Sequence, residues 1–143
     1  NFIPYGCLVD HFQQVVYEHP EMTPAERNEA WLKLEKMYRP YLDLEGMPFY
    51  GRGAGWQRQN HIYLTPFYYI DYCLAQTVAL QFWLEIEKDW KQAWEKYKMF
   101  VQRGGTDTFL GLVAGVGLAS PVEDGCIREI AGHASEWLKE HKL

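Results

Sequence analysis

Cysteine is scarce in the sequence and is nowhere closely paired. The three cysteines, Cys7, Cys73 and Cys126, are widely spaced, and no Cys-x-x-Cys motif occurs. An odd number of distant cysteines gives no support to a disulfide framework or to a thiolate zinc site. We therefore expect three buried thiols in a protein of the reducing cytoplasm.

Clusters of positive charge and long apolar runs are also missing. No run of Lys or Arg exceeds two residues, and 14 basic against 19 acidic residues give a formal net charge of -5. This balance argues against binding of nucleic acid or anionic lipid. The longest apolar stretches, such as 77–84, fall short of the roughly 18 residues that span a bilayer. We expect no nucleic-acid partner and no membrane partner, and no secretory signal is visible.

Sequence motifs of several enzyme classes are absent. The 143 residues contain no His-Glu-x-x-His and no Gly-x-Ser-x-Gly. The Gly-Arg-Gly-Ala-Gly segment at 51–55 is not followed by Lys-Ser/Thr, so a flexible loop is a better interpretation than a phosphate-binding loop. His11 and His19 have acidic neighbours but lack the helical Glu-x-x-His spacing of metal ligands. No metal site is expected in this chain.

Apolar and aromatic residues are plentiful, at 48% and 16% of the chain. This composition is far from that of a disordered protein and predicts a single folded domain over 1–143. The sequence opens at Asn1 without an initiator methionine and enters an apolar stretch at 2–9. We expect it to be part of a larger protein.

Helical periodicity and capping signals predict an all-α fold of about six helices and no strand. Thr23-Pro24-Ala25-Glu26 forms a capping box with proline at the first helical position, and Pro40 marks the end of the helix that follows. Thr106-Asp107 and a second capping box at 120–123 predict the starts of two later helices. The other helices are expected over 4–18, over 66–88, and over 90–101 as a separate helix or a bent continuation.

The segment 43–60 is rich in glycine and shows no helical periodicity. Such a long segment predicts a mobile loop within the domain. Directly after it come His61 and four tyrosines, Tyr63, Tyr68, Tyr69 and Tyr72. In a helix that starts at Pro66, Tyr68 and Tyr72 would lie one turn apart and line one wall.

Phenol and imidazole groups at neutral pH can donate hydrogen bonds to a peptide carbonyl or to an oxyanion. The competing interpretation is that the tyrosines are core or interface aromatics and that His61 caps the helix. The residue types alone leave both interpretations open.

Several longer stretches resemble one family over nearly the whole chain. They are Phe2-Ile3-Pro4-Tyr5-Gly6, Val9-Asp10-His11-Phe12-Gln13, Met22-Thr23-Pro24-Ala25-Glu26-Arg27, Trp56-Gln57-Arg58-Gln59, His61, Pro66-Phe67-Tyr68-Tyr69-Ile70-Asp71-Tyr72 with Leu74-Ala75-Gln76, and Gly117-Leu118-Ala119-Ser120-Pro121. Together they resemble the C-terminal region of oligoendopeptidase F-like peptidases, which are relatives of thimet oligopeptidase.

The resemblance implies an α-helical peptidase in which zinc, held by His-Glu-x-x-His and a later glutamate, activates water against short peptides. It assigns binding of the substrate carbonyl and stabilisation of the tetrahedral intermediate to His61 and Tyr68. A shift of one or two residues in the match would move the second role to Tyr69. Channel-shaping, substrate-binding roles fall to Tyr63, Tyr69, Tyr72, Gly53 and Gly55.

By the same resemblance, the zinc motif lies upstream of this chain in the intact enzyme. The predicted function is therefore the substrate-binding, oxyanion-stabilising portion of a zinc metalloendopeptidase, with zinc in the parent enzyme and none in this chain. We expect the isolated chain to be inactive, and its partners to be a short peptide and the missing N-terminal portion of the peptidase. Its uncovered apolar surface predicts self-association. The alternative is a noncatalytic helical protein-interaction module.

Overall fold

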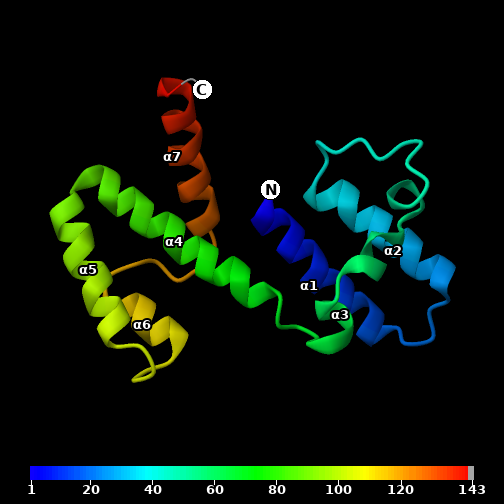
Figure 1. Ribbon diagram of the computed structural model, residues 1–143, viewed down its shortest axis with the longest axis horizontal. Coiled ribbons are helices and arrows are strands. Elements are labelled where there is room, and N and C mark those ends of the chain that lie inside the picture. The colour runs from blue at the N-terminus through cyan, green and yellow to red at the C-terminus, as the bar shows by residue number, and fades with distance from the viewer. Residues whose placement is uncertain (142–143) are drawn as a thin grey trace. The chain divides into compact units, whose positions relative to one another are not determined.

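The computed structural model describes residues 1–141 of the chain and contains seven α-helices, two 3-10 helices and no strand within that range (Figure 1). The all-α prediction is thus confirmed. The elements in chain order are α1 (Phe2–Glu18), α2 (Pro24–Tyr38), η1 (Tyr50–Arg52), η2 (Ala54–Arg58), α3 (His61–Leu64), α4 (Ile70–Lys88), α5 (Trp90–Gln102), α6 (Phe109–Gly115) and α7 (Cys126–Glu140).

The chain divides into two compact units. Unit 1 runs from Asn1 to Cys73 and unit 2 begins at Leu74, so the boundary falls one turn into α4. The single domain expected over 1–143 stays a prediction. Every residue of the candidate site belongs to unit 1.

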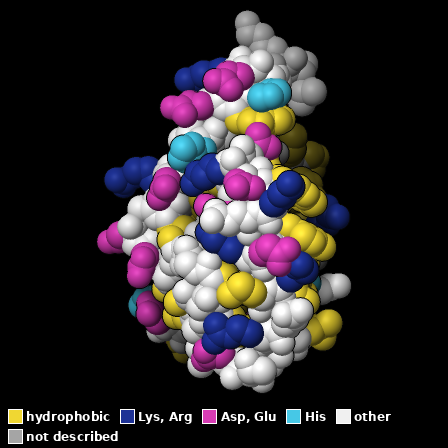
Figure 2. Space-filling view, turned by 90° about the vertical axis from the view of Figure 1, so that its left-hand side faces the viewer, with side chains coloured by type: hydrophobic (Ala, Val, Ile, Leu, Met, Phe, Trp, Pro, Cys, Tyr) yellow, Lys and Arg dark blue, Asp and Glu magenta, His cyan; other side chains and the backbone are white. Residues whose placement is uncertain are grey.

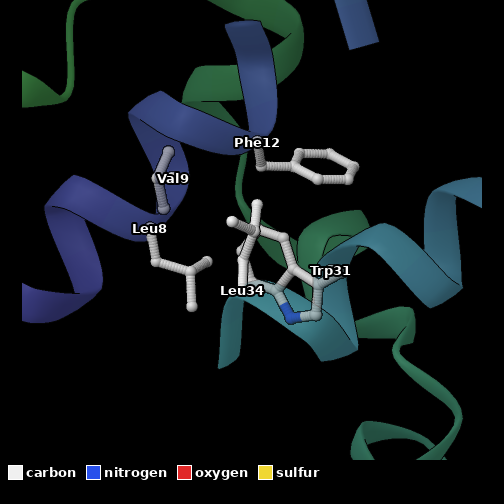
Figure 3. Packing of buried hydrophobic residues seen from close by; sticks show 5 residues of the cluster. All are labelled: Leu8, Val9, Phe12, Trp31 and Leu34. Atoms are coloured by element: carbon white, nitrogen blue, oxygen red, sulfur yellow. The ribbon is translucent and has the colours of Figure 1, made fainter. Parts of the chain in front are cut away.

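The core of unit 1 forms where α1 packs against α2 (Figure 3). Leu8 and Phe12 are one turn apart on α1 and are no more than 1% exposed, as is Trp31 of α2. The Phe12 ring meets the Trp31 ring edge to face, with 5.0 Å between centroids. Val9 and Leu34 complete the buried set. This aromatic core fixes the two helices that support the candidate site.

The start of α2 is the capping box predicted from the sequence. The backbone N–H of Thr23 donates to the Glu26 carboxylate at 2.7 Å, and the Glu26 N–H donates to the Thr23 hydroxyl at 3.3 Å. The hydrogen bond from Thr23 lowers the pKa of Glu26. Pro24 occupies the first turn, where its missing N–H costs nothing, so the local sequence alone is sufficient to begin this helix.

Two buried polar side chains organise unit 1. Glu35, 4% exposed, accepts from the indole N–H of Trp31 at 3.1 Å and pairs with Arg39, whose Nε lies 2.9 Å from Glu35 Oε2. Gln13, 1% exposed, accepts from the backbone N–H of Phe67 at 2.9 Å. Because both groups have partners, burial leaves neither with an unmet hydrogen bond. Gln13 also fixes the segment that leads into α4.

Unit 2 has a separate core of apolar residues from α4, α6 and the segment after α6. Its buried members are Val78, Phe82, Val113, Val116 and Leu118. The side-chain amide of Gln81, on α4, donates to the backbone carbonyl of Ala119 at 2.9 Å and accepts from the Ala119 N–H at 2.8 Å. α7 contacts α4 through Trp83 and Trp137, whose rings are 5.8 Å apart. On the face shown in Figure 2, acidic and basic side chains are interspersed.

Three helix starts differ from the sequence predictions. α4 begins at Ile70 and not at Pro66, because residues 66–69 form turns and Phe67 has a positive φ of 62° that no helix allows. α6 is capped by Thr108, whose hydroxyl accepts from the Gly111 N–H, in place of Thr106-Asp107. α7 begins at Cys126 after Gly125 (φ 97°), so the box expected at 120–123 caps no helix.

The 90–101 prediction is resolved in favour of a separate helix. Asp89 has extended backbone angles, and its carboxylate accepts from the N–H groups of Lys91 and Gln92. A side chain that caps the first turn of α5 in this way ends α4 at Lys88. Part of the predicted 43–60 loop is ordered as η1 and η2, while its mobility stays a prediction.

Candidate functional site

His61 is the first residue of the short helix α3, and its ring is oriented by two hydrogen bonds in series. Its Nδ1 lies 2.7 Å from the side-chain Nε2 of Gln59. The Tyr5 hydroxyl donates to Gln59 Oε1 at 2.8 Å. Since the Gln59 amide nitrogen can only donate, His61 Nδ1 is the acceptor and the neutral ring carries its proton on Nε2. The arrangement makes His61 a hydrogen-bond donor through Nε2.

Three of the predicted tyrosines surround the His61 ring. The ring centroids of Tyr69, Tyr72 and Tyr68 lie 4.9, 5.9 and 6.5 Å from that of His61. Tyr72 is 5.3 Å from Tyr68 and 5.7 Å from Tyr69. Tyr68 is 47% and Tyr72 42% exposed, so a ligand in solution can reach both. The structure therefore brings His61, Tyr68, Tyr69 and Tyr72 into one group, the His–Tyr cluster.

The backbone that presents the cluster differs from the expected helix. Tyr68 and Tyr69 precede α4 in a turn, and only Tyr72 lies in the helix. The turn follows Phe67, whose N–H is held by Gln13 and whose ring packs on Tyr17 at 5.0 Å. A left-handed backbone at a residue with a large side chain is strained and persists only where surrounding contacts fix it. Tertiary contacts with α1, rather than helical spacing, thus position Tyr68.

Hydrogen bonding and burial raise the pKa of two phenols of the cluster, those of Tyr72 and Tyr69. The hydrogen bond with Tyr68 raises the pKa of Tyr72, and burial raises the pKa of Tyr69, with a smaller contribution from the neighbouring Cys73. Burial likewise raises the pKa of Tyr5. These groups already ionise well above neutral pH, so the shifts ensure that they act as donors.

The structure places the other three predicted residues, Tyr63, Gly53 and Gly55, next to residues outside the His–Tyr cluster. Tyr63 packs on Trp56 with 6.2 Å between ring centroids and is half exposed. Gly53 has a φ of 75°, and a side chain there would overlap the backbone carbonyl of Asn28 in α2. A Cβ on Gly55 would lie 2.8 Å from Trp31 Nε1. Both glycines therefore allow the loop to approach α2 closely, and the substrate-binding roles of all three residues stay predictions.

A hollow of about 450 Å³ lies next to the Tyr5–Gln59 hydrogen bond. It is lined by residues of α1 and α2 and of the stretch 39–59, namely Tyr5, Trp31, Glu35, Arg39, Leu42, Leu44, Met47, Tyr50, Gly55, Arg58 and Gln59. Arg39 also lies over the Tyr5 ring, 4.9 Å from its centroid. The hollow thus reaches the residues that orient His61.

Tyr5 and Gln59 belong to the site, although sequence reasoning assigns no role to either residue. Gln59 is only two positions before His61, and a polar residue so close to a candidate histidine is a usable signal. Tyr5 is 54 positions from Gln59. No local pattern connects positions that far apart, because their contact depends on the packing of α1 against the 43–60 segment.

The described residues do not fit a zinc site. Within 1–141, no group of three or more His, Cys, Asp or Glu side chains lies close enough to hold a metal ion. His61 has an amide and three phenols around it, which are not a zinc-ligand set. No helix among the described residues is long and apolar enough to cross a membrane.

Comparisons with known proteins gave matches among solved structures. An X-ray structure of an oligoendopeptidase F is 46% identical to the chain, with a TM-score of 0.91, and PZ peptidase A, solved with an inhibitor, is 47% identical, also with a TM-score of 0.91. An oligoendopeptidase F from Bacillus anthracis str. Ames is 39% identical, with a TM-score of 0.75. Neither a protein-family model nor a curated protein sequence matches the chain.

Each of these matches covers 99% of this chain but only 22–25% of the length of the other protein. The chain therefore spans about a quarter of the length of the peptidases that it matches. With 46% and 47% identity over 99% of its residues to two of these structures, the chain belongs to the oligoendopeptidase F family.

Proposed function

We propose that this chain is the substrate-binding and oxyanion-stabilising portion of a zinc-dependent oligoendopeptidase that hydrolyses short peptides in the cytoplasm. The proposal rests mainly on the His–Tyr cluster, in which the ring centroids of three tyrosines lie within 6.5 Å of that of the oriented imidazole. Two of these tyrosines, Tyr68 and Tyr72, are about half exposed. The similarity to structures of oligoendopeptidase F and of PZ peptidase A supports it.

His61 and Tyr68 are the donors to the reacting carbonyl in this proposal. Gln59 leaves the proton of His61 on Nε2, and the Tyr72–Tyr68 hydrogen bond favours protonated Tyr72, which donates to the Tyr68 oxygen. The Tyr68 hydroxyl then directs its own proton to a ligand. Two such donors fixed before substrate arrives stabilise the charge that develops on the carbonyl oxygen in the transition state.

Tyr5 and Gln59 are positioning residues, since they act on substrate only through His61. Tyr5 fixes the Gln59 amide, and Gln59 fixes the His61 ring. Tyr69 and Tyr72 form the wall against which a peptide side chain would pack. A short peptide is thus the proposed ligand of the cluster.

Within 1–141, no group of side chains is arranged to hold the zinc ion that would activate the attacking water. Zinc would activate the attacking water in the intact peptidase and would be held by residues of its remaining portion. Donors to an oxyanion do not replace a missing nucleophile, so we propose that this chain is inactive alone. The N-terminal portion of the parent peptidase is its proposed partner.

The test compares two variants with matched controls in an intact peptidase that contains this segment. His61→Ala and Tyr68→Phe should each lower kcat by about 100-fold, the effect of removing one oxyanion donor. His19→Ala and Tyr41→Phe alter an exposed histidine and an exposed tyrosine outside the cluster and should leave kcat unchanged. Unchanged kcat in the first pair, with folding preserved, would reject the assignment.

A second candidate function, a noncatalytic interaction module, is favoured by one surface of unit 2. An apolar groove of about 300 Å³ lies between α4 and α5, lined by Ala79, Phe82, Trp83, Ile86, Trp90, Ala93, Trp94 and Tyr97. Trp90, Trp94 and Tyr97 form a stacked row and are 43–57% exposed. Exposed apolar patches of this kind usually mark an interface.

For a noncatalytic module the occupant of this groove is a separate protein partner. Under the first proposal the occupant is the remaining portion of the peptidase, because the matched proteins are about four times as long as the chain. Without that portion the isolated chain should self-associate through the row. Sedimentation velocity of the chain and of a Trp90→Ser/Trp94→Ser variant measures this directly. A wild-type chain that stays monomeric at all concentrations would contradict the assignment of the groove.

A further inference from the structure

Two of the three thiols meet within unit 1. Cys7 is on α1 and Cys73 is in the first turn of α4, 66 positions later in the sequence. The Cys73 Sγ lies 3.7 Å from the backbone carbonyl of Ile3. A side chain at Gly6 would overlap that sulfur, so the glycine is what lets Cys73 lie directly on the surface of α1.

The Cys7 and Cys73 thiols share a hydrogen bond, and the bond gives them different acidities. It lowers the pKa of Cys7 to about 7, against the opposing effects of burial and of the Asp10 carboxylate. The same bond raises the pKa of Cys73. The bond therefore favours the thiolate form of Cys7 and keeps the proton on Cys73. A thiolate at neutral pH is the form that attacks an oxidant.

The two thiols also differ in their exposure to solvent. Cys73 is buried, at 3% exposed, whereas Cys7 is half-buried. Groups that face the pair include Asp10, Tyr38 and Tyr69, none of which is a cation. A small uncharged oxidant such as hydrogen peroxide therefore reaches Cys7 more readily than a large or anionic one.

We propose that Cys7 and Cys73 are a peroxide-reactive thiol pair that closes to an intrachain disulfide. The Cys7 thiolate attacks one oxygen of hydrogen peroxide, the O–O bond breaks, and hydroxide leaves, which gives a sulfenic acid on Cys7. The Cys73 thiol then attacks the Cys7 sulfur, the S–O bond breaks, and water leaves with the Cys73 proton. In total, two thiols and one peroxide become one disulfide and two waters.

The disulfide would join α1 to the first turn of α4 covalently. Tyr72 directly precedes Cys73, and Tyr69 lies four residues before it. The disulfide would therefore form beside the His–Tyr cluster. A reducing thiol would reverse it. This chemistry depends only on the thiols and stands whether or not the cluster binds peptides.

The third thiol provides a matched control for the experiment. Cys126 is buried in unit 2, and burial raises its pKa, so it should resist oxidation. The full chain is treated with stoichiometric hydrogen peroxide at neutral pH, and its free thiols are counted with a maleimide reagent. We expect the count to fall from three to one and the mass to fall by two hydrogen atoms. Peptide mapping should join the fragments that contain Cys7 and Cys73.

Serine variants separate the steps. Cys73→Ser should stop at the sulfenic acid, which dimedone traps on Cys7, and Cys126→Ser should form the disulfide at the wild-type rate. Peroxide that leaves all three thiols intact would overturn the proposal, as would a disulfide that includes Cys126 or joins two chains. Mapping the wild-type chain needs no variant, so misfolding of a serine variant does not prevent the test.

Discussion

The two units of this chain use aromatic residues in opposite ways. In unit 1, Trp31 and Phe12 are buried, and the tyrosines near the surface contact a histidine in an ordered cluster. In unit 2, Trp90 and Trp94 stack on each other and are 57% and 44% exposed. This difference agrees with the two proposals made above, a ligand site in unit 1 and a protein-contacting α4–α5 face in unit 2.

The largest expected effect is on the free energy of unfolding, which should fall much more when a buried tryptophan is removed than when an exposed one is removed. Trp31→Ala removes a fully buried ring from between α1 and α2 and should lower the free energy of unfolding by about 4 kcal/mol. Trp94→Ala removes a stacked but exposed ring and should cost about 1 kcal/mol. Urea denaturation followed by circular dichroism measures both. Equal losses would contradict the distinction between the two units.

Loss of the helix cap should have a smaller effect on unit 1. Thr23→Ala removes the hydroxyl that accepts from the Glu26 N–H and should lower the free energy of unfolding by about 1 kcal/mol. Thr23→Ser keeps the acceptor oxygen and serves as the control. A Thr23→Ala chain that unfolds at the same urea concentration as wild type would show that the box contributes little in this context.

Substitution of Gln59 tests whether the hydrogen bond to His61 contributes to catalysis. Gln59→Leu removes the donor to His61 Nδ1, which frees the ring tautomer and should cost about 1 kcal/mol of transition-state stabilisation. That loss corresponds to roughly a fivefold fall in kcat of the intact peptidase. The ¹⁵N shifts of His61 in this chain should also change, and Gln57→Leu, at an exposed position, is the control. Unaltered ¹⁵N shifts would show that Gln59 does not set the tautomer.

The smallest expected effect is a dependence of folding stability on pH, to which one carboxylate in each unit contributes. A hydrogen bond from Thr23 lowers the pKa of Glu26, and one from Lys96 lowers the pKa of Glu85. Each group therefore adds stability that is complete above its ordinary pKa of 4.5 and is lost as the pH falls through its lowered value.

Glu26→Gln and Glu85→Gln should each lower Tm at neutral pH, and each variant should lose less Tm than wild type on acidification to about pH 3. Differential scanning calorimetry over that range measures the difference. If a variant and the wild-type chain lose Tm in parallel, the corresponding hydrogen bond does not favour the ionised carboxylate.

Local sequence signals predicted much of the fold. The Thr23-Pro24-Ala25-Glu26 box, the end of α2 before Pro40 and the end of α5 near residue 101 were all predicted correctly, because a helix end depends on groups within three or four residues. The same kind of signal was wrong at 66–69 and at 120–123. In the first case Gln13 holds Phe67 in a non-helical conformation, which no local pattern reveals.

The sequence by itself determined the all-α class, most helix boundaries and the choice of His61, Tyr68, Tyr69 and Tyr72 as candidates. Only the tertiary structure decided how they are oriented, through Tyr5–Gln59 contacts across 54 positions, and which thiols meet, through Cys7–Cys73 contacts across 66 positions. The physical reason is that helix formation follows from neighbouring residues. The meeting of distant side chains depends instead on closing long loops and on the packing of one core.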